Sequence, residues 1–536
     1  MPAINPHAAL ATHEVTNQPE DRGALPLWDG DAVLRGATET LGPDRRAALA
    51  AYAGTLGSEE MQAAARAANR SAPELRLFDA GGRRLDEVAF HPAYHTLLEK
   101  GLSAGYAATA WEDTPGGHLQ HAAMVYLASQ IEPGHCCPMT MTYAAVPALR
   151  GRAESWLPGI MARRYDPASR PAAQKAGVTI GMAMTEKQGG SDVRANTTRA
   201  EPDAPGRDQG WRLTGHKWFC SAPMSDGFLT LAQTAAGLSC FLVPRWTPDG
   251  ARNALHLMRL KDKLGNRANA SAEIEYHGAW AELLGEDGDG IRTILAMVHH
   301  TRLDTAMAPA GLMRRALTEA QHWVTHRTAF QRRLIDQPLM RAVLADLALD
   351  WIGAAVMGLR VARAFDAPQE APLARILVAI AKYWSNKRCP QVIYEAMECM
   401  GGVGYVEDGI MPLLYREAPL NSIWEGSGNV ICLDILRSLA RSPDSAEALR
   451  GLLASAHGRD ARYDAALAGV EAMLAAPAEH MARALTERLA LLVQAALLLD
   501  GPDEKLAAAF IEARLGAAHH THGAASTDTD AVLALL

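Results

Sequence analysis

The chain has 536 residues, which is too long for one ordinary domain and predicts two to four structural units. Apolar residues make up 49% and charged residues 21%, and the net charge of −8 excludes a protein drawn to nucleic acid by its overall charge. The seven cysteines are scattered without a C-x-x-C spacing, which argues against a zinc site or a disulfide framework.

The N-terminal stretch MPAINPHAALATHEV lacks the basic segment and apolar core of a secretory signal. No apolar run looks long enough to span a bilayer. With the cysteine usage, these features predict a cytoplasmic protein that has no membrane-spanning segment and binds no metal.

Four regions follow one another along the chain. Residues 1–177 form an arm and then an Ala- and Leu-rich region with helical spacing, so we expect mostly helix. Residues 178–288 hold short aromatic and β-branched segments separated by Gly, Pro and Asp, which predict a small antiparallel β domain of barrel type. Helical spacing returns over 289–440 as a bundle, and 441–536 predict an additional helical domain. The predicted fold class is α+β.

A Gly-rich turn, GMAMTEKQGGSDV (181–193), follows apolar strand material in the predicted β domain. The hydroxyls of Thr185 and Ser191 and the amides freed by Gly189 and Gly190 can converge on a flat polar heterocycle or a pyrophosphate. The alternative is an ordinary tight turn in which Asp192 satisfies local amides.

Two further segments carry candidate chemistry. GHKWFCSAP (215–223) places aromatic Phe219 two residues before Ser221, which suits a stacked ring beside a hydrogen-bond donor, although ordinary strand core explains the same pattern. IWEGSGN (423–429) places Glu425 as a lone acid among apolar neighbours. Desolvation raises the pKa of such a carboxyl toward that of a useful general base. The alternative is a surface acid that favours the N-terminus of the following helix.

Together these motifs resemble a known family. AMTEKQGGSDVRA (183–195) matches the signature of the acyl-CoA dehydrogenase superfamily, and the α–β–α order matches that fold. Several further segments resemble one branch of this superfamily, the AidB-like flavoproteins of the adaptive response to DNA alkylation. These segments are CPMTMTYAAVP, LKDKLGNRANAS, RLDTAM and NSIWEGSGN. The additional C-terminal helical domain also resembles that branch.

The resemblance implies FAD as the cofactor. The residues that it assigns to the FAD site within one subunit are Met182, Met184, Thr185, Gly190, Ser191, Phe219, Cys220, Ser221, Ile423, Glu425, Gly426, Ser427, Asn429 and Leu433. It further implies that Arg327, in HRTAF, reaches the FAD pyrophosphate of a neighbouring subunit in a homotetramer, a dimer of dimers. Gln331 stands where the family usually has Gly.

The resemblance also assigns the catalytic residues. Glu425 falls at the position of the base that removes the α-proton of an acyl thioester while the flavin accepts hydride from the β-carbon. Thr301 replaces the alternative base of the isovaleryl-type members, and Arg302 is expected in the same cavity, where it tunes the charge of Glu425. The sequence after Tyr405 departs from the family spacing, which predicts at most weak activity on an isovaleryl-CoA-like thioester.

The resemblance also implies that the protein binds double-stranded DNA and either shields the DNA or inactivates alkylating agents. Residues 441–536 carry eight basic and thirteen acidic side chains and therefore a net charge of −5. Within and beside this block, Arg437, Arg441 and Arg450 are the predicted DNA contacts, on one helix face, and a solvated helical surface is the alternative. The competing function is a metabolic acyl-CoA dehydrogenase that uses Glu425 and does not bind DNA.

Overall fold

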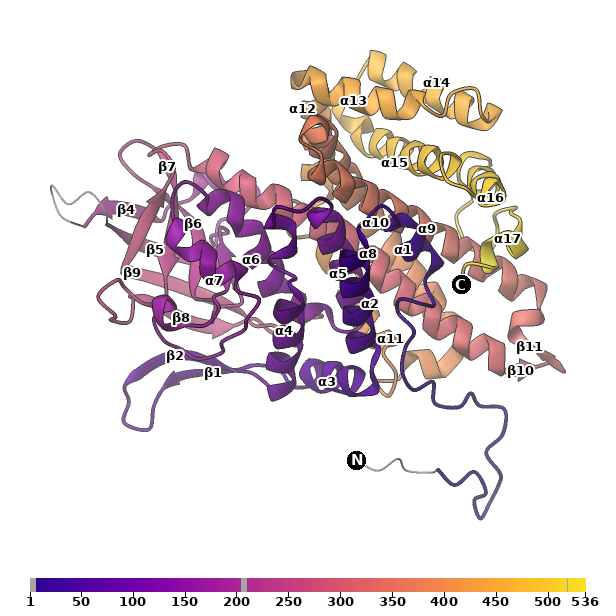
Figure 1. Cartoon of the computed structure of the whole chain (residues 1–536), viewed down its shortest axis with the longest axis horizontal. Helices are drawn as coiled ribbons and strands as arrows, with labels where there is room; N and C mark the ends of the chain where they lie inside the picture. The colour runs from indigo at the N-terminus through magenta and orange to yellow at the C-terminus, as the bar shows by residue number, and fades with distance from the viewer. Residues whose placement is uncertain (1–5, 204–209, 518) are drawn as a thin grey trace.

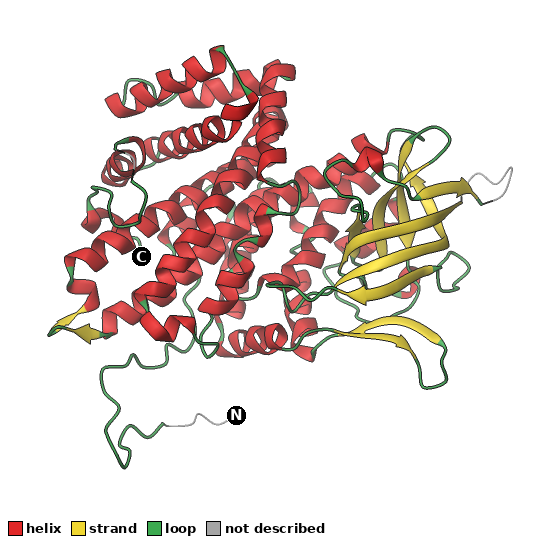
Figure 2. Cartoon of the chain, turned by 180° about the vertical axis from the view of Figure 1, so that it is seen from behind, coloured by secondary structure: helices red, strands yellow, loops and turns green. Residues whose placement is uncertain are grey.

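The computed structural model describes residues 6–203, 210–517 and 519–536. Helices make up most of the molecule, and the sheet lies at one end of it (Figure 1 and Figure 2). The C-terminal helices form a separate layer against the central bundle (Figure 1). Among the described residues no group of three or more His, Cys, Asp or Glu side chains is placed to hold a metal ion.

The N-terminal region is helical except for one hairpin. Its helices are α1 (Ala32–Ala37), α2 (Pro43–Gly57), α3 (Glu59–Arg70), α4 (Pro92–Ala104), α5 (Gly117–Ser129), α6 (Cys136–Leu149) and α7 (Leu157–Met161). The expectation of mostly helix is confirmed for this stretch, and the hairpin of β1 (Glu74–Phe78) and β2 (Arg84–Ala89) was not predicted. Asp79 fixes its turn, because Oδ1 accepts hydrogen bonds from the amides of Gly81 and Arg83, each at 2.8 Å.

The β domain consists of β3 (Ile180–Ala183), β4 (Arg199–Pro202), β5 (Trp211–Ser221), β6 (Gly227–Gln233), β7 (Leu238–Pro244), β8 (Leu255–Leu260) and β9 (Ser271–Leu284). The order is β3-β6-β4-β5-β9-β7, β8 pairs with β9, and an additional β6–β7 pairing closes the sheet on itself. Most pairings are antiparallel, as predicted, but β6 runs parallel to β3 and β4. A closed sheet removes free edges, and its interior buries Phe228, Phe241 and Tyr276.

Three long helices form the bundle: α8 (Gly290–His326), α9 (Pro338–Asp366) and α10 (Ala371–Cys399). A short hairpin of β10 (Thr328–Ala329) and β11 (Arg332–Arg333) joins α8 to α9. Part of α9 is long and apolar enough to cross a membrane by length and composition, contrary to the sequence expectation, and 83% of that stretch is buried inside the protein. Packing against α8, α10 and the C-terminal helices explains its apolar character.

The described residues that follow α10 form mainly helices. These are α11 (Met411–Glu417), α12 (Gly428–Arg441), α13 (Pro443–Ala454), α14 (Ala461–Ala475), α15 (Ala482–Leu499), α16 (Glu504–Leu515) and α17 (Thr529–Leu533). α15 packs against α9, α10 and α12. Arg514 of α16 forms ion pairs with Asp346 and Asp350 of α9, at 2.6 Å and 3.1 Å, and so fixes this layer to the bundle.

Candidate active site

The Gly-rich turn after β3 is held from behind by a buried ion pair. The carboxylate of Glu186 accepts from Lys217 Nζ at 2.8 Å and from the amides of Thr197 and Thr198, so it is Glu186, and not Asp192, that satisfies local amides. These bonds hold the pKa of Glu186 well below its usual range against the effect of burial. Thr185, which is half-buried, also accepts a backbone bond from Trp218 at 2.7 Å. The turn is therefore rigid and joined to β5.

The end of β5 presents the second predicted segment. Phe219 is 47% exposed and Ser221 is half-buried, whereas the side chain of Cys220 is fully buried in the core of the β domain. The alternation of side chains along a strand explains this difference. The predicted role of Cys220 in the FAD site stays a prediction, and its side chain points into the core of the β domain.

Two side chains that the sequence did not single out complete this face. Ser271 Oγ lies 3.3 Å from Ser221 Oγ and accepts a hydrogen bond from Lys263 Nζ at 3.2 Å. Burial lowers the pKa of Lys263. Both residues belong to LKDKLGNRANAS, so the motif that carried the resemblance also contained the signal for them.

Glu425 lies in the turn before α12 with a φ of 58°, in the left-handed region. Its Oε2 is buried and has no hydrogen-bond partner. Burial is the main cause that raises the pKa of Glu425, and the nearby Thr301 hydroxyl and the charges of Lys382 and Arg302 oppose it. A strained backbone and an unpartnered carboxylate oxygen are features of a group held ready for a reactant rather than of an exposed turn acid.

Two cations hold the main chain at Glu425 and at the following residue, Gly426. Arg302 Nε donates to the carbonyl oxygen of Glu425 at 3.1 Å, and Lys382 Nζ donates to that of Gly426 at 2.5 Å. Arg302 also binds Asp434 at 2.9 Å. Lys382 is almost completely buried, and burial lowers its pKa to about 7. Lys382 was not predicted, because a lysine within a helix carries no local sequence signal.

The remaining predicted cofactor residues divide into two groups. Met182, Met184 and Gly190 lie in or next to the Gly-rich turn after β3, and all three are half-buried. Ile423, Gly426, Ser427, Asn429 and Leu433 lie in or next to the Glu425 turn and α12. Ile423 is 64% exposed, and Asn429 Oδ1 accepts a hydrogen bond from Arg483 of α15 at 2.8 Å. The C-terminal helices therefore reach the predicted cofactor segment.

Arg327 is held by its own chain. Its Nη1 donates to the carbonyl oxygen of Asn17 at 2.7 Å, which fixes the N-terminal arm against the end of α8. The β10–β11 turn that follows holds Phe330 and Gln331 at φ values of 51° and 63°, and Phe330 is 93% exposed. The predicted contact of Arg327 with a neighbouring subunit's cofactor stays a prediction.

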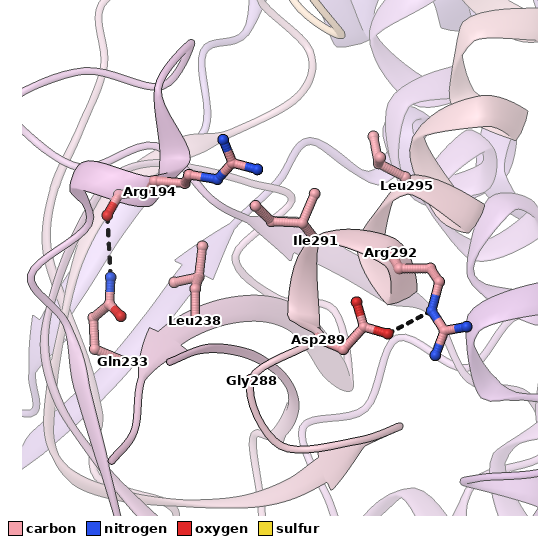
Figure 3. A pocket seen from close by; sticks show the side chains of 8 residues that line it. All are labelled: Arg194, Gln233, Leu238, Gly288, Asp289, Ile291, Arg292 and Leu295. Carbon is pink, nitrogen blue, oxygen red and sulfur yellow. Dashed lines mark hydrogen bonds and ion pairs between the residues drawn. The ribbon is translucent and has the colours of Figure 1, made fainter. Parts of the chain in front are cut away.

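A pocket of about 550 Å³ lies between Arg194, the ends of β6 and β7 that carry Gln233 and Leu238, and the start of α8 (Figure 3). Arg194 follows the turn directly, and Ile291, Arg292 and Leu295 belong to the first turns of α8, the helix that also carries Arg302. Asp289 pairs with Arg292 at 2.5 Å (Figure 3). The pocket therefore combines apolar walls with two guanidinium groups, and the sequence did not predict it.

The three arginines predicted to bind DNA are all exposed. Arg437 and Arg441 lie one turn apart on α12, whereas Arg450 lies on α13, which starts after a break at Pro443. The expectation of a single helix face is wrong for Arg450, because proline ends one helix and begins the next. α12 and α13 are neighbours at the edge of the C-terminal layer (Figure 1).

Family models match three parts of the chain. Residues 181–279 match the acyl-CoA dehydrogenase middle domain and residues 288–440 match the acyl-CoA dehydrogenase C-terminal domain. Residues 17–167 match the N-terminal domain of the adaptive response protein AidB. The fold and site thus define an FAD-dependent oxidoreductase of acyl-CoA dehydrogenase type, acting on CH–CH groups, and the predicted fold class is confirmed.

The relatives define the branch. AidB of Escherichia coli is 44% identical over 514 residues, which cover 94% of each chain. The structure of Caenorhabditis elegans ACDH-11 in complex with C11-CoA superposes with a TM-score of 0.83 at 27% identity and covers 97% of this chain and 96% of that chain. An acyl-CoA dehydrogenase from Bacillus anthracis complexed with FAD shares the fold, with a TM-score of 0.70 at 15% identity over 89% and 86% of the two chains. The chain belongs to the AidB-like branch of the acyl-CoA dehydrogenase family, and its cofactor is FAD.

Proposed function

We propose that this protein is an AidB-type flavoprotein of the alkylation-damage response. It associates as a cytoplasmic homotetramer with double-stranded DNA and protects the DNA or inactivates alkylating agents. Its acyl-CoA dehydrogenase activity is at most weak and acts on an isovaleryl-CoA-like thioester. One observation carries the proposal. The similarity to Escherichia coli AidB covers 94% of this chain and so extends past residue 440, where the acyl-CoA dehydrogenase model ends.

DNA association requires cations that neutralise phosphates. Arg437, Arg441 and Arg450 are exposed, and two of them lie one turn apart on α12. Because residues 441–536 carry a net charge of −5, binding has to come from such local clusters and from their repetition in a tetramer. The proposed surface is therefore small in each subunit and depends on the assembly.

The test is binding of a fluorescent DNA duplex to the FAD-loaded protein across a salt series. Binding should weaken steeply with salt, and replacement of Arg437 and Arg441 by Ala should lower the slope by about one per lost phosphate contact. Arg459→Ala is the matched control, since Arg459 is paired with Asp500. Absence of binding at low salt would remove the DNA role and leave the flavoenzyme.

The residues of the candidate site fit FAD. Phe219 at the end of β5 and Ile423 next to Glu425 are exposed apolar side chains, as expected where a flat cofactor completes the surface. The two methionines of the turn, Thr185, Ser191, the end of β5 and the start of α12 would hold it. FAD supplies the acceptor for the two electrons and the hydrogen that leave the β-carbon.

Glu425 would take the α-proton on Oε2, the oxygen that has no partner. The acyl thioester would lie against Glu425. The phosphate groups of its coenzyme A portion would reach the pocket that contains Arg194 and Arg292. Arg302 and Lys382 hold the Glu425 turn in place through its carbonyl groups. Glu425→Gln tests this role: the variant should retain FAD and lose the bleaching of the flavin by isovaleryl-CoA. Unchanged bleaching would remove Glu425 from the mechanism.

A second function has its own supporting observation. The pocket with two guanidinium groups and the acidic C-terminal block favour a metabolic acyl-CoA dehydrogenase without DNA binding. Rapid bleaching by short acyl-CoA thioesters together with absence of duplex binding would establish this alternative.

A further inference from the structure

Three side chains form a row of hydrogen bonds that leads from the interior of the protein to the end of β5. Lys263 Nζ lies 3.2 Å from Ser271 Oγ, and Ser271 Oγ lies 3.3 Å from Ser221 Oγ. Ser221 ends β5, Ser271 begins β9, and the two residues are direct cross-strand partners in neighbouring strands (Figure 1). The row ends at Ser221, whose hydroxyl is predicted to contact FAD.

The chemistry of the three groups sets the direction of these bonds. An ammonium group only donates, so Ser271 Oγ accepts from Lys263. Ser271 is almost completely buried, and Ser221 Oγ is the other partner that its hydroxyl has among the described residues. A buried hydroxyl that donates to nothing is costly, so Ser271 donates to Ser221. Ser221 is half-buried and accepts from inside the protein, which leaves its own hydrogen for a partner on the open side of β5.

The loop that carries Lys263, between β8 and β9, is held in place by the helical part of the protein. Asn266 donates to Glu417 of α11 through its main-chain amide at 2.5 Å and through Nδ2 at 2.9 Å. Lys263 Nζ also donates to the carbonyl oxygen of Asn269 in the same loop, at 2.7 Å. These bonds hold the ammonium group in a fixed place relative to the start of β9.

No direct acidic partner cancels the charge of Lys263 within the described part of the chain, because its hydrogen bonds go to a carbonyl group and a hydroxyl. The titratable groups that face it are Glu132, Cys137 and Glu417. Burial raises the pKa of Glu417 to about 7 and that of Cys137 to about 12, so neither holds a full negative charge at neutral pH. The carboxylate of Glu132 accepts hydrogen bonds from two main-chain amides of the turn that follows it.

We propose that Lys263 and Ser271 are positioning residues that orient the Ser221 hydroxyl as a donor to FAD and make FAD easier to reduce. The proposal rests on the predicted contact of Ser221 with FAD. A fixed positive charge and a donor polarised by it stabilise the negative charge that FAD gains when it accepts electrons. Without the bond from Lys263, Ser271 can accept from Ser221 instead, and the outward donor is lost.

The test is the midpoint potential of bound FAD, measured by anaerobic reductive titration against a reference dye. Lys263→Met removes the charge and the first donor but keeps an unbranched side chain. Its equilibrium constant for reduction should fall about tenfold, which is about 30 mV for a two-electron couple. Ser271→Ala keeps the charge and interrupts the row, so its potential should fall by less. Ser271→Thr keeps the hydroxyl and should retain the wild-type potential.

Lys175→Met is the matched control. The side chain of Lys175 is also buried, but its Nζ is bound to Asp226 at 2.6 Å, so its charge is already balanced and its loss should leave the potential of FAD unchanged. If Lys263→Met fails to fold, the comparison of Ser271→Ala with Ser271→Thr provides the test. A fall in Lys175→Met equal to that in Lys263→Met would overturn the proposal, because any buried lysine would then have the same effect.

Ser221→Ala separates this proposal from the placement of FAD. A lowered potential in Ser221→Ala, with unchanged potentials in Lys263→Met and Ser271→Ala, would overturn this proposal alone. Unchanged potentials in all three variants would remove Ser221 from the FAD site and this proposal with it. A lowered potential in all three, restored in Ser271→Thr, is the result that we expect.

Discussion

Arg302 binds the main chain of Glu425 and not its carboxylate: Nε donates to the carbonyl oxygen at 3.1 Å, while Nη1 binds Asp434 at 2.9 Å. The guanidinium therefore fixes the turn and acts on the carboxylate only through space, where it lowers the pKa of Glu425. The sequence-based expectation that Arg302 shares the cavity and tunes the charge of Glu425 is consistent with this arrangement. The hydrogen bond from Arg302 to the main-chain carbonyl of Glu425 could not be predicted from the sequence.

Arg302→Gln should raise the pKa of Glu425, because a positive charge that stabilises the carboxylate is removed. A base works only when deprotonated, so the acid limb of the bleaching profile should move up by about 0.5–1 pH unit. Arg375→Gln is the matched control. Arg375 binds the same Asp434 at 2.8 Å but does not touch Glu425. An equal shift in both variants would show that Asp434, and not Arg302, controls the base.

Gly190→Ala should lower the FAD content of the purified protein. A Cβ at this position would lie 2.3 Å from Thr185 Oγ1, so the hydroxyl predicted to contact FAD would have to move. The ratio of flavin to protein absorbance measures the loss, and a tenfold weaker affinity corresponds to about 1.4 kcal/mol. Gly402→Ala is the control, since a Cβ there meets nothing within 4 Å. Full FAD content in Gly190→Ala would place the cofactor away from this turn.

The sequence predicted the elements that have local patterns. Ordered hydrophobic spacing placed the helices and the β domain, and the Gly-rich turn and IWEGSGN were recognised because their residues lie close together in the chain. The β1–β2 hairpin was missed although ELRLF alternates, because it is short and is flanked by helices. The parallel pairing of β6 with β3 and β4 depends on closure of the sheet, which no segment reveals alone.

The parts of the site that the sequence did not reveal come from contacts between distant segments. Lys382 reaches Gly426 across 44 positions, and Ser221 reaches Ser271 across 50. Neither pair has a local spacing rule. Strand alternation along WFCS explains why the Cys220 side chain is buried between the less buried Phe219 and Ser221. Arg450 was grouped with Arg437 because the break at Pro443 was not weighed.

Lys382→Met should change how stability depends on pH. Burial lowers the pKa of Lys382 to about 7 in the folded protein, whereas an unfolded chain has a value of about 10.4. Between these values the unfolded chain binds more protons, so the wild type should gain stability as pH rises through the window. The methionine variant should lack this gain, which is at most about 5 kcal/mol.

The measurement is the midpoint of thermal unfolding at pH 7 and pH 9.5 for Lys382→Met, with Lys505→Met as the control at an exposed lysine of α16. The difference between the midpoints should be smaller in Lys382→Met than in wild type and unchanged in the control. Equal differences in all three proteins would contradict a strongly lowered pKa of Lys382.

Arg514→Met should loosen the C-terminal helices. Arg514 binds Asp346 at 2.6 Å and Asp350 at 3.1 Å, and the pKa of Asp350 is held well below its usual range by Arg514 and Arg388 against burial. Loss of Arg514 leaves buried carboxylates short of a partner, which typically costs about 3–5 kcal/mol. Arg459→Met, at an exposed pair with Asp500, should cost less than about 1 kcal/mol.

The same ion pairs should make this layer sensitive to acid. A carboxyl with a lowered pKa in the folded state contributes stability above its unfolded-state pKa of about 3.9 and loses that contribution as pH falls through the folded value. Arg514→Met raises the pKa of Asp350 toward the ordinary value, so its acid unfolding should begin at higher pH than that of wild type. Limited proteolysis between α12 and α13 at decreasing pH measures this. Identical cleavage of both proteins would mean that apolar packing of α15 on α9 and α10, rather than the ion pairs, holds the layer in place.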